Sequence, residues 1–287
     1  MNRILVFVIL FAFIFSFSSC EIINPEETIP SYIHIDSISF KTLAGEGANT
    51  KQIKDAWVYV DNQSIGCFEL PATIPILASG EHKIDIRPGI KLNGISATRS
   101  LYPYYKPYIT TLNLTPNSIL QVDPSTSYLD DVNFKFIESF EPSGIYFEKS
   151  SNSDTNINIT STTNITINQG SYASIFVNND RKLFECINSL NYPLSKYGSP
   201  AFIELDCKSN IPFTIGVFVN NPTQSIQRPL VVITKSENWK KLYINLTGVA
   251  QEERNAIDYK VFFGAQWDAQ YGVDTGYILI DNIKLIN

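Results

Sequence analysis

Residues 201–219 read AFIELDCKSNIPFTIGVFV, and they hold two short apolar segments, 201–205 and 213–219, on either side of a polar stretch. Only residues 249–256 have a composition that could form a turn or two of helix. Apolar segments of the same kind, with Gly, Pro or Asn between them, recur at 173–177, 230–233, 241–246, 259–263 and 277–285. Many strands without helices predict an all-β protein built from sandwiches or jelly rolls.

The first half of the chain also shows apolar segments of strand length, here separated by short turns. In residues 56–60, Trp57 and Tyr59 fall on one face and Val58 and Val60 on the other, because side chains alternate along a strand. An aromatic content of 13% also favours strands. We predict strands at 56–60, 64–70, 73–77 and 82–87, with turns at 61–63 and 79–81.

Within this half, VYVDNQSIG at 58–66 and LPATIPILASGEHKIDI at 70–86 resemble PEGA-type and related immunoglobulin-like β modules of surface proteins. The motif of those modules is a strand, a turn with Asp and Gly, a Pro-bounded strand, and Gly-x-His before the next strand. The resemblance implies an immunoglobulin-like β-sandwich for residues 32–135, and it carries no activity.

A second resemblance covers residues 136–287. ESFE at 138–141, the 201–219 stretch, NWKKLYINLT at 238–247 and GYILIDNIKLIN at 276–287 look like strands of a carbohydrate-binding-module jelly roll, the galactose-binding-like fold. In that family an early Phe-Glu strand lies against a closing Ile-Asp-Asn-Ile-x-Leu strand. The resemblance implies a C-terminal jelly-roll β-sandwich, in a family whose members bind sugars, lipids, proteins or nothing.

The start of the chain is typical of an export signal. Arg3 supplies a positive charge, residues 4–15 are an unbroken apolar run, and small residues follow. This run is too short to remain as a membrane span. Phe-Ser-Ser-Cys at 17–20 resembles a bacterial lipobox, which implies removal of the signal peptide 1–19 and acylation of Cys20 by fatty acids such as palmitate. We therefore expect a lipoprotein of the cell envelope, held at the outer membrane by its lipid and a tether at 20–31.

Charge and cysteine content narrow the possible partners. The formal net charge is −6 and no basic tract appears, which argues against nucleic acid as a partner.

If Cys20 carries lipid, Cys67, Cys186 and Cys207 remain, so at least one thiol is unpaired. Cys186 and Cys207 could pair across adjacent strands, or all three thiols could be small buried apolar groups.

One candidate ligand site lies in the sequence GAQWDAQYGVDTG at 264–276. It places Trp267, Asp268, Tyr271 and Asp274 in a Gly-bounded loop between two predicted strands. An aromatic ring for stacking, together with carboxylates that accept sugar hydroxyls, would make a carbohydrate site. The other interpretation is that Trp267 folds back to cover the end of the sandwich.

A second candidate is a group of four tyrosines, Tyr102, Tyr104, Tyr105 and Tyr108. Their rings could stack on a sugar or a peptide while their hydroxyls bond outward. The interpretation that we favour is a Pro-stiffened strand edge whose tyrosines cover the rim of the core.

The jelly-roll resemblance also implies a possible structural calcium ion, with Glu141 and Asp281 at the matching positions. Calcium takes about 6–8 oxygen ligands, so backbone carbonyls would have to complete the shell. Alternatively, Asp281 caps a turn.

His34 and His82 are the only histidines, and no Cys/His cluster suggests zinc. No nucleophile elbow, phosphate loop or dinucleotide fingerprint appears, so we predict no enzyme and no other cofactor.

These observations lead to a non-catalytic binding protein, with a glycan as the leading ligand. The alternative is an accessory subunit of an outer-membrane protein complex, in which the 102–108 segment would be an interface, since tyrosine is enriched in buried interface cores. A hydrolase is the third and least favoured hypothesis.

Overall fold

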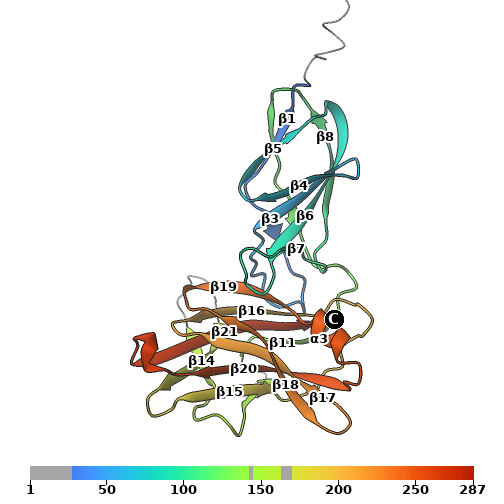
Figure 1. Cartoon of the computed structure of the whole chain (residues 1–287). Helices are drawn as coiled ribbons and strands as arrows, with labels where there is room; N and C mark the ends of the chain where they lie inside the picture. The colour runs from blue at the N-terminus through green and yellow to red at the C-terminus, as the bar shows by residue number, and fades with distance from the viewer. Residues whose placement is uncertain (1–27, 142–144, 163–169) are drawn as a thin grey trace, which may run out of the picture.

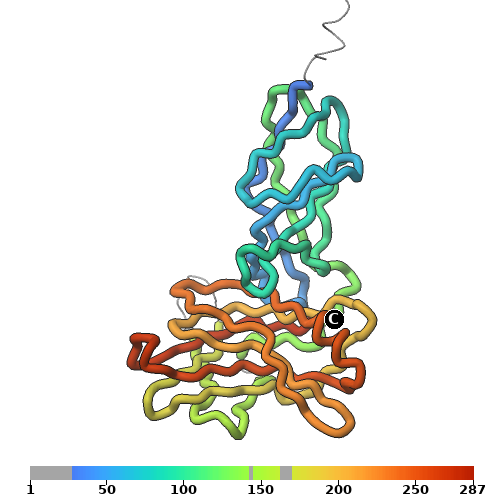
Figure 2. The backbone as a smooth tube through the Cα atoms, viewed as in Figure 1, coloured from blue at the N-terminus to red at the C-terminus, as the bar shows by residue number. Residues whose placement is uncertain are grey.

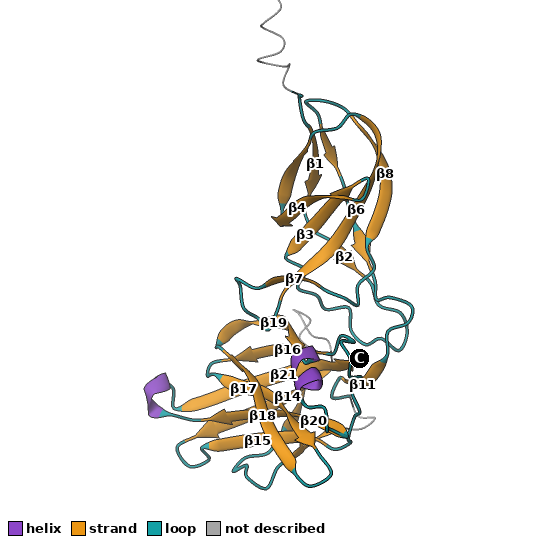
Figure 3. Cartoon of the chain, turned by 45° about the vertical axis from the view of Figure 1, so that its right-hand side comes forward, coloured by secondary structure: helices purple, strands orange, loops and turns teal. Residues whose placement is uncertain are grey.

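The computed structural model describes residues 28–141, 145–162 and 170–287, and these fold into two units of strands stacked one on the other (Figure 1). The predicted all-β class is confirmed. Within the described ranges, the helices are the short α3 (Thr247–Glu252), which overlaps the predicted 249–256 segment, and the 3-10 turn η1 (Ala269–Tyr271) (Figure 3). Neither has the length and apolar character needed to cross a membrane. The signal peptide, Cys20 and most of the tether lie outside the described residues.

The N-terminal unit is built from three small sheets. One has the order β4-β3-β6-β7 with β8 on β6, another is β5-β1-β9, and a third pairs β10 with β2. The bounds are β1 (Ser31–Ile35), β2 (Ser39–Phe40), β3 (Asp55–Val60), β4 (Gln63–Glu69), β5 (Ala72–Ile76), β6 (Gly80–Lys91), β7 (Arg99–Leu101), β8 (Tyr108–Leu114), β9 (Ile119–Gln121) and β10 (Ser125–Thr126).

Period-two alternation explains the core of this unit. Ile33 and Ile35 of β1, Val58 of β3, and Ile84 and Ile86 of β6 are fully buried and meet in one cluster. The strands β3, β4, β5 and β6 agree with the predicted ones to within a few residues.

The turn between β3 and β4 also agrees with its prediction. It consists of Asp61 and Asn62, with φ of 49° and 68°. Two consecutive positive φ angles make the hairpin turn that matches the twist of the strands, and Asp and Asn tolerate them better than most side chains.

The C-terminal unit is a sandwich of two sheets. One has the order β13-β14-β21-β16-β19 with β11 on β21, and the other is β12-β15-β20-β17-β18. We call the first the covered sheet, because the N-terminal unit lies on its outward face, and the second the open sheet (Figure 1). The bounds are β11 (Phe134–Glu138), β12 (Phe147–Lys149), β13 (Asn158–Thr162), β14 (Gly170–Asn178), β15 (Leu183–Asn188), β16 (Phe202–Ser209), β17 (Phe213–Asn220), β18 (Ser225–Ile233), β19 (Ser236–Asn245), β20 (Asp258–Gln266) and β21 (Thr275–Ile286).

The 201–219 stretch joins the two sheets. Its first half forms β16 in the covered sheet and its second half forms β17 in the open sheet. Ile203 and Leu205 of β16 and Ile215 and Val217 of β17 are fully buried and belong to the same core cluster. Alternate residues of both strands therefore fill the space between the sheets, and the residues between them point outward.

The outward face of the covered sheet is the interface with the N-terminal unit. Glu204 of β16 is fully buried there and accepts hydrogen bonds from Tyr102 Oη at 2.6 Å and Tyr128 Oη at 2.8 Å. Lys241 Nζ lies 3.2 Å from the same carboxylate. The aromatic and aliphatic side chains around Glu204 form what we call the interface cluster: Phe40, Ile90, Tyr102, Tyr104, Tyr105, Tyr128, Phe202, Tyr243 and Ile286.

Burial and neighbouring charges shift the pKa values of the ionisable groups in this interface. Burial alone would raise the pKa of Glu204, but Lys241, Lys284 and the two tyrosine hydroxyls outweigh it and leave this pKa below its usual value. Burial lowers the pKa of Lys284 to about 8, with the charge of Lys241 adding to the effect. Lys284 Nζ donates to Ala48 O at 3.0 Å and to Tyr128 Oη at 3.1 Å.

The three described cysteines are free thiols. Cys186 lies on β15 of the open sheet and Cys207 on β16 of the covered sheet, and both are fully buried in the sandwich core. Burial raises the pKa of the Cys207 thiol to about 12. Both side chains therefore behave as small apolar residues.

Candidate ligand-binding face

The outward face of the open sheet points away from the N-terminal unit (Figure 1). On β17, Ile215, Val217 and Val219 fill the core, so Gly216 and Phe218 face outward. The same alternation on the neighbouring strand β20 turns Lys260, Phe262 and Gly264 outward while Val261 and Phe263 fill the core. Two aromatic rings therefore stand on the outside of this sheet.

Gly216 makes room for one of these rings. A Cβ atom at this position would lie 2.3 Å from Phe262 Cε1 and 2.5 Å from the carbonyl oxygen of Arg228. The Phe262 ring therefore lies on the bare backbone of β17 and is only 2% exposed. The ring of Phe218 lies 5.3 Å from that of Phe262, tilted by 60°, and remains half-buried at the surface. The two rings therefore support one another on the outward face.

Beside Phe218 the surface is hollowed into a groove of about 510 Å³. We call it the sheet groove. It combines an apolar floor with polar and charged groups of both signs. Its lining residues are Glu148, Lys149, Ser150, Ile187, Asn191, Phe218, Asn220, Ser225 and Lys260.

Hydrogen bonds fix the polar groups at one end of the sheet groove. Asp258 accepts from Asn220 Nδ2 at 2.6 Å and from Asn191 Nδ2 at 3.2 Å. Ser225 Oγ donates to Asn220 Oδ1 at 2.7 Å. Lys260 Nζ donates to the backbone oxygen of Ser189 at 3.1 Å. These bonds orient the amides and the ammonium group before any ligand arrives.

A second set of polar groups crosses the open sheet next to the groove. Gln227 Nε2 of β18 donates to Glu185 Oε2 of β15 at 2.7 Å. The other carboxylate oxygen of Glu185 accepts from Ser150 Oγ at 2.7 Å. This face thus carries both hydrogen-bond donors and acceptors close to its aromatic pair.

The predicted Trp267 loop has a more closed structure than a free binding loop. Trp267 is half-buried, packs against the sandwich core, and donates from Nε1 to Val273 O at 3.1 Å. Tyr271 also packs against that core, whereas Asp268 and Asp274 are exposed. Asp268 caps η1 by accepting from Gln270 N at 2.9 Å. This geometry agrees with the interpretation that Trp267 covers the end of the sandwich, and its role as a ligand contact stays a prediction.

The structure corrects the binding-platform hypothesis for three of the tyrosines. Tyr102, Tyr104 and Tyr105 are at most 9% exposed and belong to the interface cluster. Their rings are covered by the C-terminal sandwich, so they cannot stack on a ligand from solvent. Tyr108 is half-buried on β8 and packs against the core of the N-terminal unit. Tyr102, Tyr104 and Tyr105 thus form an interface within the chain, and they no longer count as evidence for an accessory subunit.

Of the predicted calcium ligands, Asp281 is buried on β21, and the charges of Asp206 and Glu141 act on it. Burial is the main cause that raises the pKa of Asp281 to about 7. Its oxygens already accept from the backbone N–H of Asn282 at 2.7 Å and from Asn282 Nδ2 at 3.3 Å. Glu141 accepts from Ser171 N at 2.8 Å. Among the described residues no three His, Cys, Asp or Glu side chains are grouped to hold a metal ion.

The sheet groove was not among the sites predicted from the sequence. Phe218 and Phe262 lie inside apolar runs, VFV and VFF, which gave no reason to expect a solvent-facing ring. The available signal was Gly216: a glycine in a strand marks a close approach, and here it lies two residues from Phe218 on the same face.

Comparisons with known proteins complete this description. No family model and no curated protein sequence matches the chain. Solved structures similar to it include a family 11 carbohydrate-binding module of Clostridium thermocellum Lic26A-Cel5E, with 14% identity over 54% of this chain and 95% of that one, at a TM-score of 0.38. The CBM22-2 xylan-binding domain of Paenibacillus barcinonensis Xyn10C matches with 13% identity over 52% and 97%, at 0.37. A family 30 module of Clostridium thermocellum matches with 15% identity over 52% and 96%, at 0.38.

Proposed function

We propose that this protein is a non-catalytic glycan-binding lipoprotein of the cell envelope, and that the sheet groove holds the sugar. The observation that carries the proposal is the half-buried Phe218 ring, supported by Phe262 and set among pre-bonded amides, an ammonium group and carboxylates. The Phe218 ring packs against Phe262 and still keeps part of its surface exposed to solvent.

The chemistry of a sugar ring suits this arrangement. One face of the ring presents C–H groups, which pack on the face of an aromatic ring, and its edge presents hydroxyls that need donors and acceptors. Phe218 supplies the apolar surface, while Asn191, Asn220 and Lys260 supply polar groups beside it. A volume of about 510 Å³ falls in the range of small-molecule sites and suits a short stretch of oligosaccharide.

The proposed binding test compares the half-buried Phe218 with an exposed phenylalanine on the opposite sheet. Phe218→Ala removes the ring from the sheet groove, whereas Phe176→Ala removes a 48% exposed ring from β14 of the covered sheet. Glycans that bind the wild type on a polysaccharide array should bind Phe218→Ala about tenfold more weakly by calorimetry. Phe176→Ala should bind like the wild type. Equal affinities for all three proteins would contradict the site, and absence of any glycan binding by the wild type would contradict the function.

The lipid anchor is supported by the sequence of residues 1–20. Acyl chains on Cys20 would hold the chain at the outer membrane, since each buried methylene contributes about 0.8 kcal/mol and two or more chains give stable anchoring. The first described residues lie at the end of the N-terminal unit remote from the sandwich (Figure 2). The open sheet would then face away from the anchor.

Cys20→Ser tests this part separately. Wild-type protein should incorporate a palmitate analogue and sediment with outer membranes, and the variant should do neither. Wild-type protein that retains residues 1–19 in the cytoplasm would refute the anchor without bearing on the sheet groove.

A further inference from the structure

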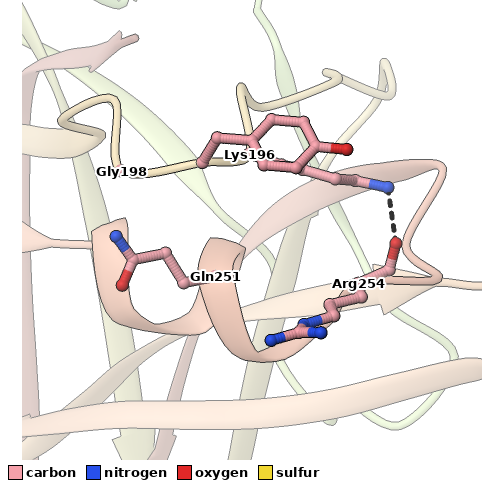
Figure 4. Close-up of a pocket in the computed structure, with 5 residues that line it drawn as sticks. Lys196, Gly198, Gln251 and Arg254 are labelled. Carbon is pink, nitrogen blue, oxygen red and sulfur yellow. Dashed lines mark hydrogen bonds between the residues drawn. The ribbon is translucent and has the colours of Figure 1, made fainter.

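A second hollow lies at one end of the sandwich, between the loop at 195–199 and helix α3. Its volume is about 620 Å³, and it is lined by Lys196, Tyr197, Gly198, Gln251 and Arg254. Figure 4 shows Lys196 reaching from its loop to the end of α3, with Gln251 and Arg254 on the helix side. We call this hollow the end pocket.

Tyr197 has no packing role in the described structure. Its side chain is 100% exposed, and its φ of 67° lies in the left-handed region that bulky residues avoid. Gly198 follows with φ of 87°, so two consecutive left-handed residues turn the tyrosine out of the loop. An aromatic ring held outward on a strained backbone, with no burial in return, is a feature that a ligand contact explains.

Two positively charged side chains, Lys196 and Arg254, line the end pocket together with Tyr197. Lys196 Nζ donates to the backbone oxygen of Arg254 at 2.7 Å. Across residues 28–141, 145–162 and 170–287, no salt bridge involves Lys196 or the Arg254 guanidinium, whereas neighbouring Glu253 is paired with Arg228. The pair is therefore free to attract an anion, in a chain whose overall charge is −6.

The end pocket and the sheet groove are built on the same two chain segments. Asn191 and Lys260 line the groove, whereas Lys196 and Arg254 line the pocket. Between them, Tyr192 and Tyr259 bond through their backbones, N to O at 3.0 Å and 2.9 Å. One polymer that follows these segments would meet both sites.

The geometry points to an anion subsite, in which Lys196 and Arg254 bind a carboxylate or sulfate of an acidic polysaccharide while Tyr197 packs on the adjoining sugar ring. This inference rests on the proposed function and deepens it, because it names the class of glycan. Gln251 adds an amide that can donate to the anion or accept from a hydroxyl. Arg and Lys are the side chains suited to carboxylate and sulfate oxygens.

The test compares charged and neutralised forms of the same polymers. Polygalacturonate with few methyl esters is measured against the highly esterified form, and dextran sulfate against dextran, by affinity electrophoresis at 150 mM salt. The proteins are the wild type, a variant with Lys196→Gln and Arg254→Gln, and a control with Lys182→Gln and Lys235→Gln. The control removes two exposed lysines that form no salt bridge within the described part of the chain, and so makes the same change in net charge.

The wild type should bind at least one charged polymer about tenfold more tightly than its neutral form, and the polymer preferred identifies carboxylate or sulfate. The Lys196 and Arg254 variant should bind both forms alike, while the control keeps the preference. Tyr197→Ala should weaken binding of the charged polymer with unchanged thermal stability. Equal binding of both forms by the wild type, or the same loss in the control, would overturn the inference and leave the sheet groove in place. Loss of binding to neutral polymers in Phe218→Ala alone reports on the groove.

Discussion

The two sheets of the C-terminal sandwich both carry aromatic side chains on their outward faces, but protein covers only one of these faces. On the covered sheet, Phe202 and Tyr243 pack against tyrosines of the N-terminal unit. On the open sheet, Phe218 and Phe262 pack only against one another and their own sheet. The difference separates aromatic residues that join two units from one ring, that of Phe218, that stays partly exposed to solvent.

The polar groups of the two faces differ in the same way. The Glu204 carboxylate on the covered face is fully buried, and tyrosine hydroxyls and a lysine surround it. Asp258 on the open face is bonded by the exposed Asn191 amide and the half-buried Asn220 amide, which retain hydrogen-bonding capacity for a ligand. Polar groups on the covered face act on stability, and we expect those on the open face to act on binding.

The largest expected effect is that of Glu204→Ala. It leaves Lys241 and Lys284 buried without their shared counter-charge and removes the acceptor of two tyrosine hydroxyls. We expect a loss of about 3–5 kcal/mol in the free energy of unfolding, measured with urea. Glu185→Ala, the matched carboxylate change on the open face, should cost about 1–2 kcal/mol. Similar losses for the two variants would remove the distinction between the faces.

A smaller effect is expected from adding one methyl group to the open face. Gly216→Ala places a Cβ atom against Phe262 and against the Arg228 backbone, which cannot move aside without shifting β18. We expect a loss of about 1–3 kcal/mol in unfolding free energy and weaker glycan binding, because Phe262 would no longer support Phe218. Gly264→Ala is the control, since its nearest neighbour would lie 3.6 Å away. A Gly216→Ala protein as stable as the wild type would show that the Phe262 ring does not pack on the backbone of β17 at Gly216.

Asp281→Asn on the covered sheet tests a pH-dependent effect. Because the folded pKa of Asp281 is raised to about 7, the folded state holds this proton more tightly than the unfolded chain. The free energy of unfolding should therefore fall as pH rises from about 4 to about 7. The Asn variant imitates the protonated form, so it should exceed the wild type by at least about 1 kcal/mol at pH 8 and match it near pH 4.

The same pair of proteins tests the predicted calcium ion. If Glu141 and Asp281 bind calcium, millimolar calcium should raise the melting temperature of the wild type at pH 8 and leave that of Asp281→Asn unchanged. No calcium effect on either protein would contradict the prediction, and the pH dependence would still report the burial of Asp281.

The smallest expected effect on binding is that of Trp267→Ala. The half-buried ring packs against the end of the core, so its loss should cost about 1–2 kcal/mol of unfolding free energy. Glycan affinity should stay within about twofold of the wild type, because the indole N–H is already bonded to Val273. A tenfold loss of affinity in a folded variant would make the Trp267 loop the ligand site in place of the sheet groove.

The sequence was sufficient to predict where the strands lie, but it did not predict what packs against their outward side chains. Alternation and turn residues predicted β3 to β6 and the β16 and β17 segments, because these signals are local. What covers Tyr102 depends on how the two units stack, and no local pattern contains that information. Phe218 was not predicted because residues 213–219 form one apolar segment, in which a single outward phenylalanine does not stand out. The pairing of β17 with β20 places Phe262 opposite Gly216, and this long-range contact is absent from any local pattern.

The hydrogen bonds and charges around Glu204 also restrict the rotation of the two units relative to one another. A linker between independent modules would let each tumble at its own rate, but here Tyr102, Tyr128 and Lys284 are locked across the junction by directed bonds. Nitrogen-15 relaxation should accordingly give one correlation time for amides in both halves. If Cys20 anchors the chain as proposed, a force on a ligand bound to the C-terminal unit would therefore be transmitted to the lipid without bending between the two units.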